Sequence, residues 1–544
     1  MSTPKSYRYV HTTNKSGIKF IDALLEDQVW DQDADGGLSM SFSFPWVQGN
    51  ASFYGKSDPN KYTTTDEPNA QYHFALNTTQ QNAAIAALQS WANVANLHFT
   101  EVADNANSAG DIRFGWTSAA NANKAWGWTY SPSEIPAAGD VWISSNSSAY
   151  TSNDWAKGSY NYMSLMHEVG HALGLKHPFE DGVILDSNVD TSRYTVMSYT
   201  GYANDLFRTI SYDQQGKPSF NFYDINPETP MILDILTMQY LYGANTSYHR
   251  GDDVYTFDPN QPFMKTIWDA GGNDTISVAN FTEPCTISLV DGTYSDIRIV
   301  SAPLPAGYTG GTTPTYEGKM NLGIAFDAYI ENAIGGAGAD TLIGNDLNNT
   351  LTGNAGNDWL DGGAGLDSAN YAGLRSAYQI SNLGSQFSVN DKSGHDGVDR
   401  LTNVERLHFS DINVALDYQG IAGQAFRLYQ AAFDRKPDLP GLGYWLAQMD
   451  KGASLSNVAA SFLASAEFQR LVGSNPSNTQ LIDSFYKNVL HRLPDQAGYD
   501  YWLGQLSNKQ ITPAGILASF AESTENQAQV IASIQNGIDY QVWL

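Results

Sequence analysis

Residues 335–370 form four consecutive nine-residue segments, and this repeat constrains the fold more than any other feature of the 544-residue chain. The segments read GGAGADTLI, GNDLNNTLT, GNAGNDWLD and GGAGLDSAN, with Leu342, Leu351, Leu360 and Ala369 in one shared position. The glycines permit tight turns and the apolar position supplies a thin internal core. A flexible Gly/Asn linker, the alternative, has no nine-residue period. The repeat therefore predicts short parallel strands stacked into a β-roll.

Acidic side chains accompany the turns of this repeat. Asp340, Asp358 and Asp367 fill the aspartate position, and Asn349 stands there in the second segment. Carboxylates and turn carbonyls are the oxygen ligands that Ca²⁺ prefers, so we expect several structural calcium ions and doubt a site at Asn349. The whole chain is acidic, with 57 Asp and Glu against 29 Lys and Arg. Such a charge repels phosphate backbones and excludes nucleic acid as a partner.

The chain is too long for one hydrophobic core, and its amino-acid composition and secondary-structure patterns change along the sequence. After an N-terminal extension, residues 1–16, residues 17–241 alternate strand-like and helical runs and predict an α/β domain. Residues 242–416 are rich in Gly, Asn, Asp and Thr and contain the roll, which predicts an all-β domain. Helical patterns return in residues 417–544 and predict a small all-α domain.

The all-α stretch contains an internal duplication. The segment LYQAAFDRKPDLPGLGYWLAQM aligns with FYKNVLHRLPDQAGYDYWLGQL at a constant offset, which pairs Arg435 with Arg492 and Asp438 with Asp495. Two copies of one helical unit, each with aromatic residues, should pack into a single domain.

The segment HEVGHALGLKHP, residues 167–178, concentrates histidines. His167 and His171 are four residues apart and share one face of a helix. Gly174 can end that helix, so the chain can turn and bring His177 to the same point. The pattern predicts one catalytic Zn²⁺ on three histidines, with Glu168 beside the bound water as general base. The full spacing fixes five residues over eleven positions, which disfavours an ordinary histidine-bearing helix.

A second segment, RYTVMSYTGY, follows and contains Met197 and Tyr199. A methionine in an isolated segment is more often core filler. A methionine-containing turn after the extended three-histidine motif is the metzincin signature.

The chain resembles the serralysins, the secreted bacterial zinc metalloproteases among the metzincins. The resemblance covers roughly residues 16–375 and includes SGIKFIDALLEDQVW, the histidine motif, VMSY, MILDILTMQYLYGAN, WDAGGNDTI and YIENAIGGAGADTLIG. It implies a zinc- and calcium-dependent endopeptidase that hydrolyses extracellular proteins and peptides. Glu168 would activate the zinc-bound water and pass its proton to the leaving amine.

Further site residues follow from the resemblance. Tyr199 matches a tyrosine that can bind zinc in the resting enzyme and stabilise the oxyanion during hydrolysis. Met197 would form an apolar floor under the histidines. Ala125, Trp126 and Gly127 match the edge strand that pairs with an extended substrate.

The resemblance also implies calcium ligands, through side chains or backbone carbonyls, at the domain junction and at the entry to the roll. They are His249, Gly251, Asp253, Asp269, Gly271, Gly272, Asp274, Tyr329, Glu331, Gly336, Gly338 and Asp340, followed by Asp358 and Asp367 in later repeats.

Some features depart from the family. The loop TGGTTPTYEG near Gly310 reads as an insertion, and the N-terminal extension is short for an inhibitory propeptide. Cys285 is the single cysteine, so the chain forms no intramolecular disulfide. It lies far downstream of the histidine motif, which excludes a cysteine switch in a pro-segment.

The N-terminus lacks the apolar core of a secretory signal, and no stretch has the length of a membrane span. Serralysins leave Gram-negative cells through a type I exporter that reads a C-terminal signal, so the resemblance implies leaderless secretion with that apparatus as a partner. The C-terminal domain resembles a duplicated helical domain of unassigned function in secreted and surface-layer-associated bacterial proteins. Attachment to the cell surface or S-layer, targeting or export, and a stability cap for the open end of the roll all remain open.

Three functions compete. The first is an active extracellular endopeptidase, which the intact motif favours. The second is a binding or surface-layer protein with a vestigial protease-like domain, which predicts a lost glutamate or histidine, and none is lost. The third is a processing enzyme with one narrow target. Serine or cysteine catalysis has little support, because no G-x-S-x-G segment exists and Cys285 has no adjacent histidine.

Overall fold

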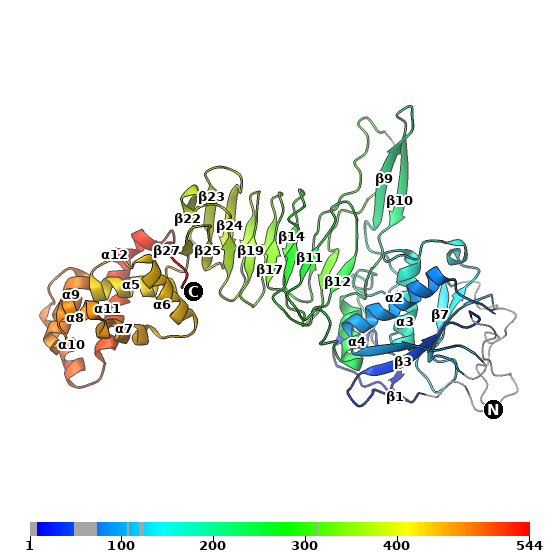
Figure 1. Cartoon of the computed structure of the whole chain (residues 1–544), viewed down its shortest axis with the longest axis horizontal. Coiled ribbons are helices and arrows are strands. Elements are labelled where there is room, and N and C mark those ends of the chain that lie inside the picture. The colour runs from blue at the N-terminus through cyan, green and yellow to red at the C-terminus, as the bar shows by residue number, and fades with distance from the viewer. Residues whose placement is uncertain (1–7, 48–72, 106–107, 119–124, 310–312, 544) are drawn as a thin grey trace. The chain divides into compact units, whose positions relative to one another are not determined.

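The computed structural model describes residues 8–47, 73–105, 108–118, 125–309 and 313–543, which form two compact units (Figure 1). Unit 1 comprises residues 1–330 and unit 2 residues 331–544. The predicted boundaries after residues 241 and 416 remain predictions, and the two units divide within the stretch predicted as β-roll. Among the described residues, no helix is both long and apolar enough to cross a membrane.

Unit 1 begins with a mostly parallel sheet in the order β5-β3-β6-β8-β7, with β4 paired to β6. Among the strands of this sheet that the structure describes, β7, at one edge, and β4 run antiparallel to their partners. The strands are β3 (Leu38–Ser43), β4 (His73–Phe74), β5 (Leu97–Glu101), β6 (Ile112–Thr117), β7 (Gly127–Thr129) and β8 (Val141–Ser144). The edge position leaves β7 free on one side to pair with another extended chain.

Two helices pack together beside this sheet. A reciprocal cap between Asn77 and Gln80 starts helix α2 (Thr78–Val94). Trp91 of α2 is fully buried, and its indole N–H donates to the carbonyl of Met166 in α3 (Tyr160–Leu173) at 3.1 Å. The buried face of α2 thus anchors the helix that carries the histidine motif.

The described part of the N-terminal extension belongs to unit 1. Strand β1 (Val10–Thr12) pairs antiparallel with β2 (Gln28–Trp30). The carbonyl of Asn14 accepts a hydrogen bond from Tyr240 of α4 (Ile232–Tyr242) at 3.1 Å. Short α1 (Lys19–Asp22) follows β1, and a 3₁₀ turn, η3 (Ser148–Thr151), precedes α3.

A long hairpin follows the histidine motif. Strands β9 (Leu206–Tyr212) and β10 (Pro218–Asp224) pair antiparallel, and residues 299–309 and 313–317 run beside them (Figure 1). The guanidinium of Arg208 donates twice to the carbonyl of Ala302, and the amide of Tyr316 donates to the carbonyl of Leu206 at 2.7 Å. The predicted insertion, of which residues 310–312 lie outside the described residues, therefore supports this hairpin.

Short strands complete unit 1. Parallel pairs join β11 to β13 and β12 to β16, and β15 pairs antiparallel with β16. Their bounds are β11 (Val254–Thr256), β12 (Lys265–Ile267), β13 (Thr275–Ser277), β14 (Thr286–Ser288), β15 (Tyr294–Ser295) and β16 (Leu322–Ile324).

Unit 2 begins with the repeat strands, which alternate between two parallel ladders. One ladder joins β17 (Asn332–Ile334), β19 (Thr350–Thr352), β21 (Ser368–Asn370) and β25 (Arg406–His408). The other joins β18 (Thr341–Ile343), β20 (Trp359–Asp361) and β24 (Val398–Thr402). Leu342, Leu351, Leu360 and Ala369 are completely buried between the ladders, which confirms the predicted roll.

An antiparallel hairpin interrupts the repeat after β21. Beyond the short turn η4 (Arg375–Ala377), β22 (Tyr378–Asn382) pairs with β23 (Phe387–Asp391), and β23 pairs antiparallel with β24. The roll then resumes in β24 and β25.

The predicted duplication produces two matching sets of helices. In each set an Asp caps a helix: Asp438 accepts from the amide of Gly441, and Asp495 from that of Gly498, both at 2.9 Å. The first set is α5 (Ile421–Phe433), α6 (Leu439–Asp450), α7 (Leu455–Ala464) and α8 (Ala466–Val472). The second is α9 (Asn478–Leu490), α10 (Gln496–Ser507), α11 (Pro513–Ala521) and α12 (Thr524–Ile534). One apolar core spans both sets, as expected for one helical domain.

The C-terminal segment adds a strand that the sequence analysis does not predict. Strand β27 (Ile538–Tyr540) pairs antiparallel with β26 (Asn413–Ala415), which itself pairs with β25. With α/β, parallel β-roll and all-α parts all present, the predicted fold class is confirmed.

Candidate active site

Helix α3 brings the histidine motif together. The hydroxyl of Ser159 caps its first turn, and Gly174 ends it with a φ of 105°, a left-handed conformation that favours glycine. After this turn the amide of Lys176 donates to the carbonyl of Leu24 at 2.8 Å. That contact directs the chain back toward α3 and places His177 opposite His171.

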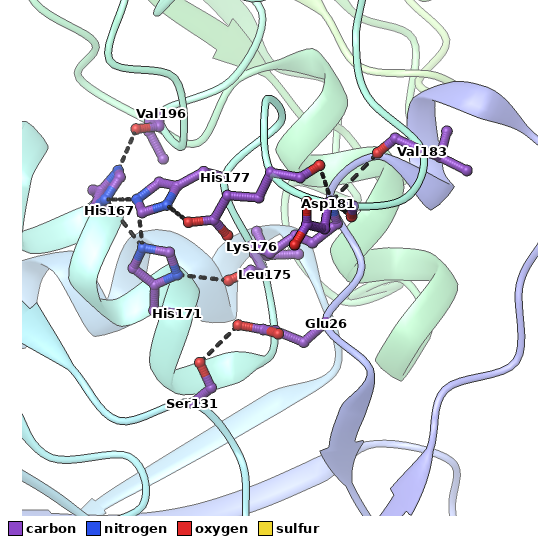
Figure 2. A network of polar contacts seen from close by, with 11 residues as sticks. Glu26, Ser131, His167, His171, Leu175, Lys176, His177, Asp181, Val183 and Val196 are labelled. Atoms are coloured by element: carbon purple, nitrogen blue, oxygen red, sulfur yellow. Dashed lines mark hydrogen bonds and ion pairs between the residues drawn. The ribbon is translucent and has the colours of Figure 1, made fainter.

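The three imidazole rings point toward one another (Figure 2). Their Nε2 atoms lie 3.1 Å apart for His167 and His171, 3.0 Å for His171 and His177, and 3.2 Å for His167 and His177. Tetrahedral ligands at 2.0–2.1 Å from Zn²⁺ lie about 3.3 Å apart. The donor set therefore fits a single zinc ion.

The second nitrogen of each ring has a partner of its own. Nδ1 of His167 contacts the carbonyl of Val196 at 2.8 Å, Nδ1 of His171 that of Leu175 at 2.7 Å, and Nδ1 of His177 a carboxylate oxygen of Glu180 at 2.6 Å. An N–H at each Nδ1 satisfies these acceptors and leaves the Nε2 lone pairs for a metal.

Burial keeps two of these rings neutral. Burial lowers the pKa of His167 to about 4 and that of His171 well below its ordinary value, and neighbouring histidines add to both effects. A metal ligand must be an unprotonated nitrogen, so the environment favours the form that binds zinc.

Glu168 lies next to this group under the edge strand. It is 5% exposed, and the hydroxyl of Thr129 donates to its Oε2 at 2.7 Å. Burial raises the pKa of Glu168 to about 7, against the opposing effect of Thr129. A Cβ on Gly127 would lie 3.5 Å from Oε1 of Glu168 and 2.8 Å from the carbonyl of Trp142. Glycine thus avoids a clash with the Trp142 carbonyl on the neighbouring strand, while Glu168 lies at ordinary contact distance.

Met197 lies against the helix that carries the first two histidines. Its side chain is fully buried, and its sulfur would be 2.6 Å from a Cβ added to Gly170, on the helix between His167 and His171. It therefore packs directly against the helical turn that carries the histidines.

Asp234 of α4, which the sequence analysis missed, supports the turn around Met197. Its carboxylate accepts hydrogen bonds from the hydroxyl of Thr195 at 2.6 Å and from the amides of Val196 and Met231 at 2.8 Å. Val196 in turn holds His167, so a contiguous path joins Asp234 to a candidate ligand. Asp234 is the single acidic residue in the apolar segment MILDILTMQYLY, and this isolated charge could have indicated a buried role.

Replacing Asp234 by leucine should weaken zinc binding by about 10- to 100-fold, because the carbonyl that orients His167 loses its support. Asparagine should cost less. Its oxygen can accept from the two amides, and its amino group can donate to the hydroxyl of Thr195. Zinc affinity measured by chelator competition for both variants tests this expectation, and equal affinities in wild type and the leucine variant would refute it.

Tyr199 lies above the histidines. Its side chain is 70% exposed, and its ring centroid lies 5.6 Å from that of His167 and 4.5 Å from that of His177. One side of the ring packs against His167 and His177, and this partial burial, with the charge of Glu168, raises the pKa of Tyr199 to about 12. Phe179, not predicted, stacks on His177 at 5.1 Å and touches Tyr199.

A cavity of about 450 Å³ adjoins these groups. The predicted substrate-pairing residues Ala125, Trp126 and Gly127 line it together with His167 and Glu168. Trp126 is fixed by an indole hydrogen bond to Asn161 at 3.0 Å. The arrangement places the residues of the edge strand, the carboxylate of Glu168 and one of the three histidines, His167, around one cleft.

Several of the predicted calcium ligands of unit 1 converge. Atoms of His249, Asp253 and Asp269 lie within 4.8 Å of one another. Asp274 accepts from the amide of Asp253 at 2.7 Å. Glycines bring the loops close: Gly271 has a φ of 124°, and a Cβ on Gly272 would lie 2.1 Å from the carbonyl of Gly251. Tyr329 is half exposed and lies outside this cluster.

The roll of unit 2 contains buried carboxylate oxygens that fit a cation. Oδ2 of Asp358 and Oδ2 of Asp367 are buried and have no hydrogen-bond partner among the described residues. Burial raises the pKa of Asp358 to about 8 and that of Asp367 to about 7. Buried, unpaired carboxylates of this kind are typical of calcium sites.

The other predicted ligands of the roll lie in the same turns. The amide of Gly336 donates to Asp340 at 2.6 Å, and the carbonyl of Gly338 abuts Gly356. The side-chain amide of Asn349 donates to the carbonyl of Glu331 at 3.1 Å. The side chain of Asn349 thus offers an N–H donor at the position where the other segments have a carboxylate. An N–H group cannot bind a cation, which is the reason to doubt a calcium site in this segment.

Two acidic residues of the roll, Asp399 and Glu405, were not predicted from the sequence. The backbone amide of Asp340 donates to the carboxylate of Asp358 at 2.8 Å. The backbone amide of Asp358 donates to the carboxylate of Asp399 at 2.9 Å. In the same way the amide of Asp367 donates to Glu405 at 2.9 Å. Asp399 and Glu405 thus continue the two rows of acids beyond the last recognisable nonamer.

Comparison with known proteins identifies three regions. Residues 60–199 match the Matrixin family, residues 232–436 match the Peptidase M10 serralysin C-terminal family, and residues 459–530 match the domain of unknown function DUF4214. The last region coincides with the helices from α7 to α12.

Individual relatives agree with these assignments. The chain is 33% identical to serralysin of Photorhabdus luminescens over 287 residues, which is 50% of this chain and 54% of that protein. It is 33% identical to metalloprotease AprA of Pseudomonas entomophila (strain L48) over 345 residues, or 60% of this chain and 62% of that protein. It is 36% identical to serralysin C of Dickeya chrysanthemi over 285 residues, or 49% and 54%.

The chain thus spans between half and two thirds of these relatives. The matches cover both the histidine motif and the repeat region. The chain is therefore similar to the serralysins and matrixins over residues 60–199 and 232–436, and it carries in addition a DUF4214 region at residues 459–530.

Proposed function

We propose that this chain is a zinc- and calcium-dependent endopeptidase that hydrolyses extracellular proteins and peptides. The observation that carries the proposal is the convergence of three Nε2 atoms within 3.2 Å beside the buried carboxylate of Glu168. The relatives named serralysin and metalloprotease support the same activity.

In this proposal His167, His171 and His177 hold Zn²⁺, which when bound polarises the scissile carbonyl and acidifies a water. Glu168 accepts the proton of the attacking water and passes it to the leaving amine, and Thr129 fixes the orientation of its carboxylate. The protonated hydroxyl of Tyr199 donates to the developing oxyanion. Ala125, Trp126 and Gly127 orient the substrate through backbone hydrogen bonds.

Hydrolysis of an unfolded protein tests this proposal. Casein should be cleaved by the full chain loaded with zinc in millimolar calcium, cleavage should stop when a chelator removes zinc, and added zinc should restore it. If the zinc-loaded protein leaves casein intact, a narrow processing enzyme or a surface-binding protein becomes the better proposal.

The calcium sites are proposed to stabilise the fold. His249, Asp253 and Asp269, with Gly251, Gly271, Gly272 and Asp274, would form one site region, and Asp340, Asp358 and Asp367 would bind calcium between turns of the roll. Tyr329, Glu331, Gly336 and Gly338 would contribute carbonyl oxygens at its entry.

Removal of calcium should unfold the roll, because the carboxylates of Asp358 and Asp367 would then be buried without a counter-charge. We expect a chelator specific for calcium to remove the part of the β-strand circular dichroism of the full-length chain that comes from the roll, and excess calcium to restore it. Asp358→Asn should raise the calcium concentration at the midpoint of refolding. An unchanged spectrum in chelator would contradict a structural role for calcium.

We further propose that the protein is secreted without an N-terminal leader through a type I apparatus of a Gram-negative bacterium, as its resemblance to the serralysins implies. The proposed domains are those of the sequence analysis: the extension 1–16, the protease domain 17–241, the roll domain 242–416 and the helical domain 417–544. For the helical domain, a cell-surface or S-layer attachment role is the proposal, since two matched helical sets form one folded body beyond the roll.

A further inference from the structure

The hairpin of β9 and β10 forms one wall of the cavity beside Glu168. Asp205 immediately precedes β9, Asp224 ends β10, and both line the cavity. The amide of Ile225 donates to the carbonyl of Asp205 at 2.8 Å, so the two ends of the hairpin meet at this wall.

Contacts along the hairpin hold this wall in place. The Phe207 ring lies 5.5 Å from that of Tyr223 and 6.2 Å from that of Tyr316. The twofold hydrogen bond from Arg208 to Ala302 fixes the opposite face. The carboxylates at the base of the hairpin are therefore presented by a braced element.

The electrostatics of the cavity are one-sided. No lysine or arginine occurs among the described residues that line it, and Lys157 lines a neighbouring cavity that shares Asp224. Burial, reinforced by the carboxylate of Asp224, raises the pKa of Asp205. Glu228, farther from the catalytic groups, differs because the ammonium of Lys265 lies 3.9 Å from its carboxylate. A cationic group that enters the cavity would relieve the repulsion between these two neighbouring carboxyl groups, Asp205 and Asp224, and favour their ionised forms.

The direction of the edge strand decides which part of a substrate reaches this cavity. The chain runs from Ala125 toward Thr129, and Glu168 contacts Thr129 while the cavity extends past Ala125 and Trp126. A substrate that pairs antiparallel with this edge runs in the opposite sense. Its residues on the C-terminal side of the cleaved bond then point into the cavity.

We propose that Asp205 and Asp224 select substrates with a lysine or arginine directly after the cleaved bond, an inference that rests on the proposed endopeptidase function. The aliphatic stem of such a side chain fills the space between Trp126 and Ile225, and its cationic end meets the two carboxylates.

Two peptides that differ only in the residue after the cleaved bond test the proposal. One carries lysine and the other norleucine, which has a similar aliphatic stem without the ammonium. The wild-type ratio of kcat/KM should favour lysine by about tenfold, the size expected for a partly exposed ion pair to two carboxylates. In Asp205→Asn/Asp224→Asn the ratio should approach one, and Asp224→Lys should favour a third peptide with glutamate.

Glu101→Gln is the matched control, since it removes one negative charge from the exposed end of β5, outside this cavity. It should retain the wild-type ratio. Equal kcat/KM for lysine and norleucine in the wild type would overturn the proposal, while leaving the endopeptidase function intact.

Binding provides a readout without turnover. The dissociation constants of both peptides for zinc-loaded Glu168→Gln, measured by fluorescence anisotropy, should differ in the same direction, and the difference should shrink at high salt. If the wild type cleaves no peptide, the proposed endopeptidase function is wrong. The ratio of the two dissociation constants then still tests the selectivity for a positive charge, and a ratio of one would overturn that selectivity.

Discussion

Glu168→Gln should lower kcat for peptide hydrolysis by about a thousandfold, within the range for loss of a general base. Glutamine has nearly the same shape and can still accept the hydrogen bond from Thr129, but it cannot take a proton from water. Bound zinc and the thermal unfolding curve should stay near those of wild type, because the Nε2 atoms of the three histidines do not depend on this carboxylate.

The matched control is Glu180→Gln, which alters a carboxylate that contacts the ring of His177 at 2.6 Å on the side away from the other histidines. It should lower activity through weaker zinc binding, and excess zinc should restore it. Activity of Glu168→Gln should not recover with zinc. If zinc does restore the Glu168 variant, Glu168 supports the metal and is not the base.

Asp104→Ala should lower the free energy of unfolding by about 3–5 kcal/mol, as is typical when one partner of a buried ion pair is removed. The side chains of Asp104 and Arg113 are both completely buried. Arg113 donates to the two carboxylate oxygens at 2.7 and 2.9 Å, and Ser43 donates to the same carboxylate at 2.8 Å. The alanine variant leaves a guanidinium charge inside the sheet between β3 and β6.

Denaturant unfolding followed by tryptophan fluorescence measures this loss, and Glu101→Gln provides a surface control on the neighbouring strand. A double variant, Asp104→Leu/Arg113→Met, should recover much of the stability because no charge remains buried. If Asp104→Ala unfolds at the same denaturant concentration as wild type, the guanidinium must find another counter-charge.

The candidate metal site was predictable because its chemistry is local in sequence. His167, His171 and His177 lie within eleven residues, and helix geometry plus one left-handed glycine suffice to bring them together. Asp234 acts on the same site from 38 residues beyond Val196. No periodic sequence pattern links Asp234 to Val196, so their contact is seen only in the folded structure.

In the roll, too, contacts between residues that are far apart in the sequence could not be predicted. Its acids lie 18 residues apart while the nonamers persist, as for Asp340 and Asp358. The hairpin of β22 and β23 enlarges the next step to 41 residues, from Asp358 to Asp399. A search for a fixed period loses the row at that point, although the ladder continues in space. The hairpin of β9 and β10 was missed because polar and aromatic residues share its strands without strict alternation.

The pairing of β27 with β26 makes the helical sets an insertion between two adjacent strands of one sheet. Both ends of the helical bundle are consequently tethered to the same ladder, and Arg375 adds an ion pair to Asp539 of β27 at 3.2 Å. Loss of residues 538–543 would leave the backbone donors and acceptors of β26 uncovered. Uncovered strand edges of this kind recruit other chains. With β27 in place, the ladder instead ends beside α6, where the amide of Gln541 donates to the carbonyl of Leu439 at 3.1 Å, and this contact opposes intermolecular sheet extension and self-association.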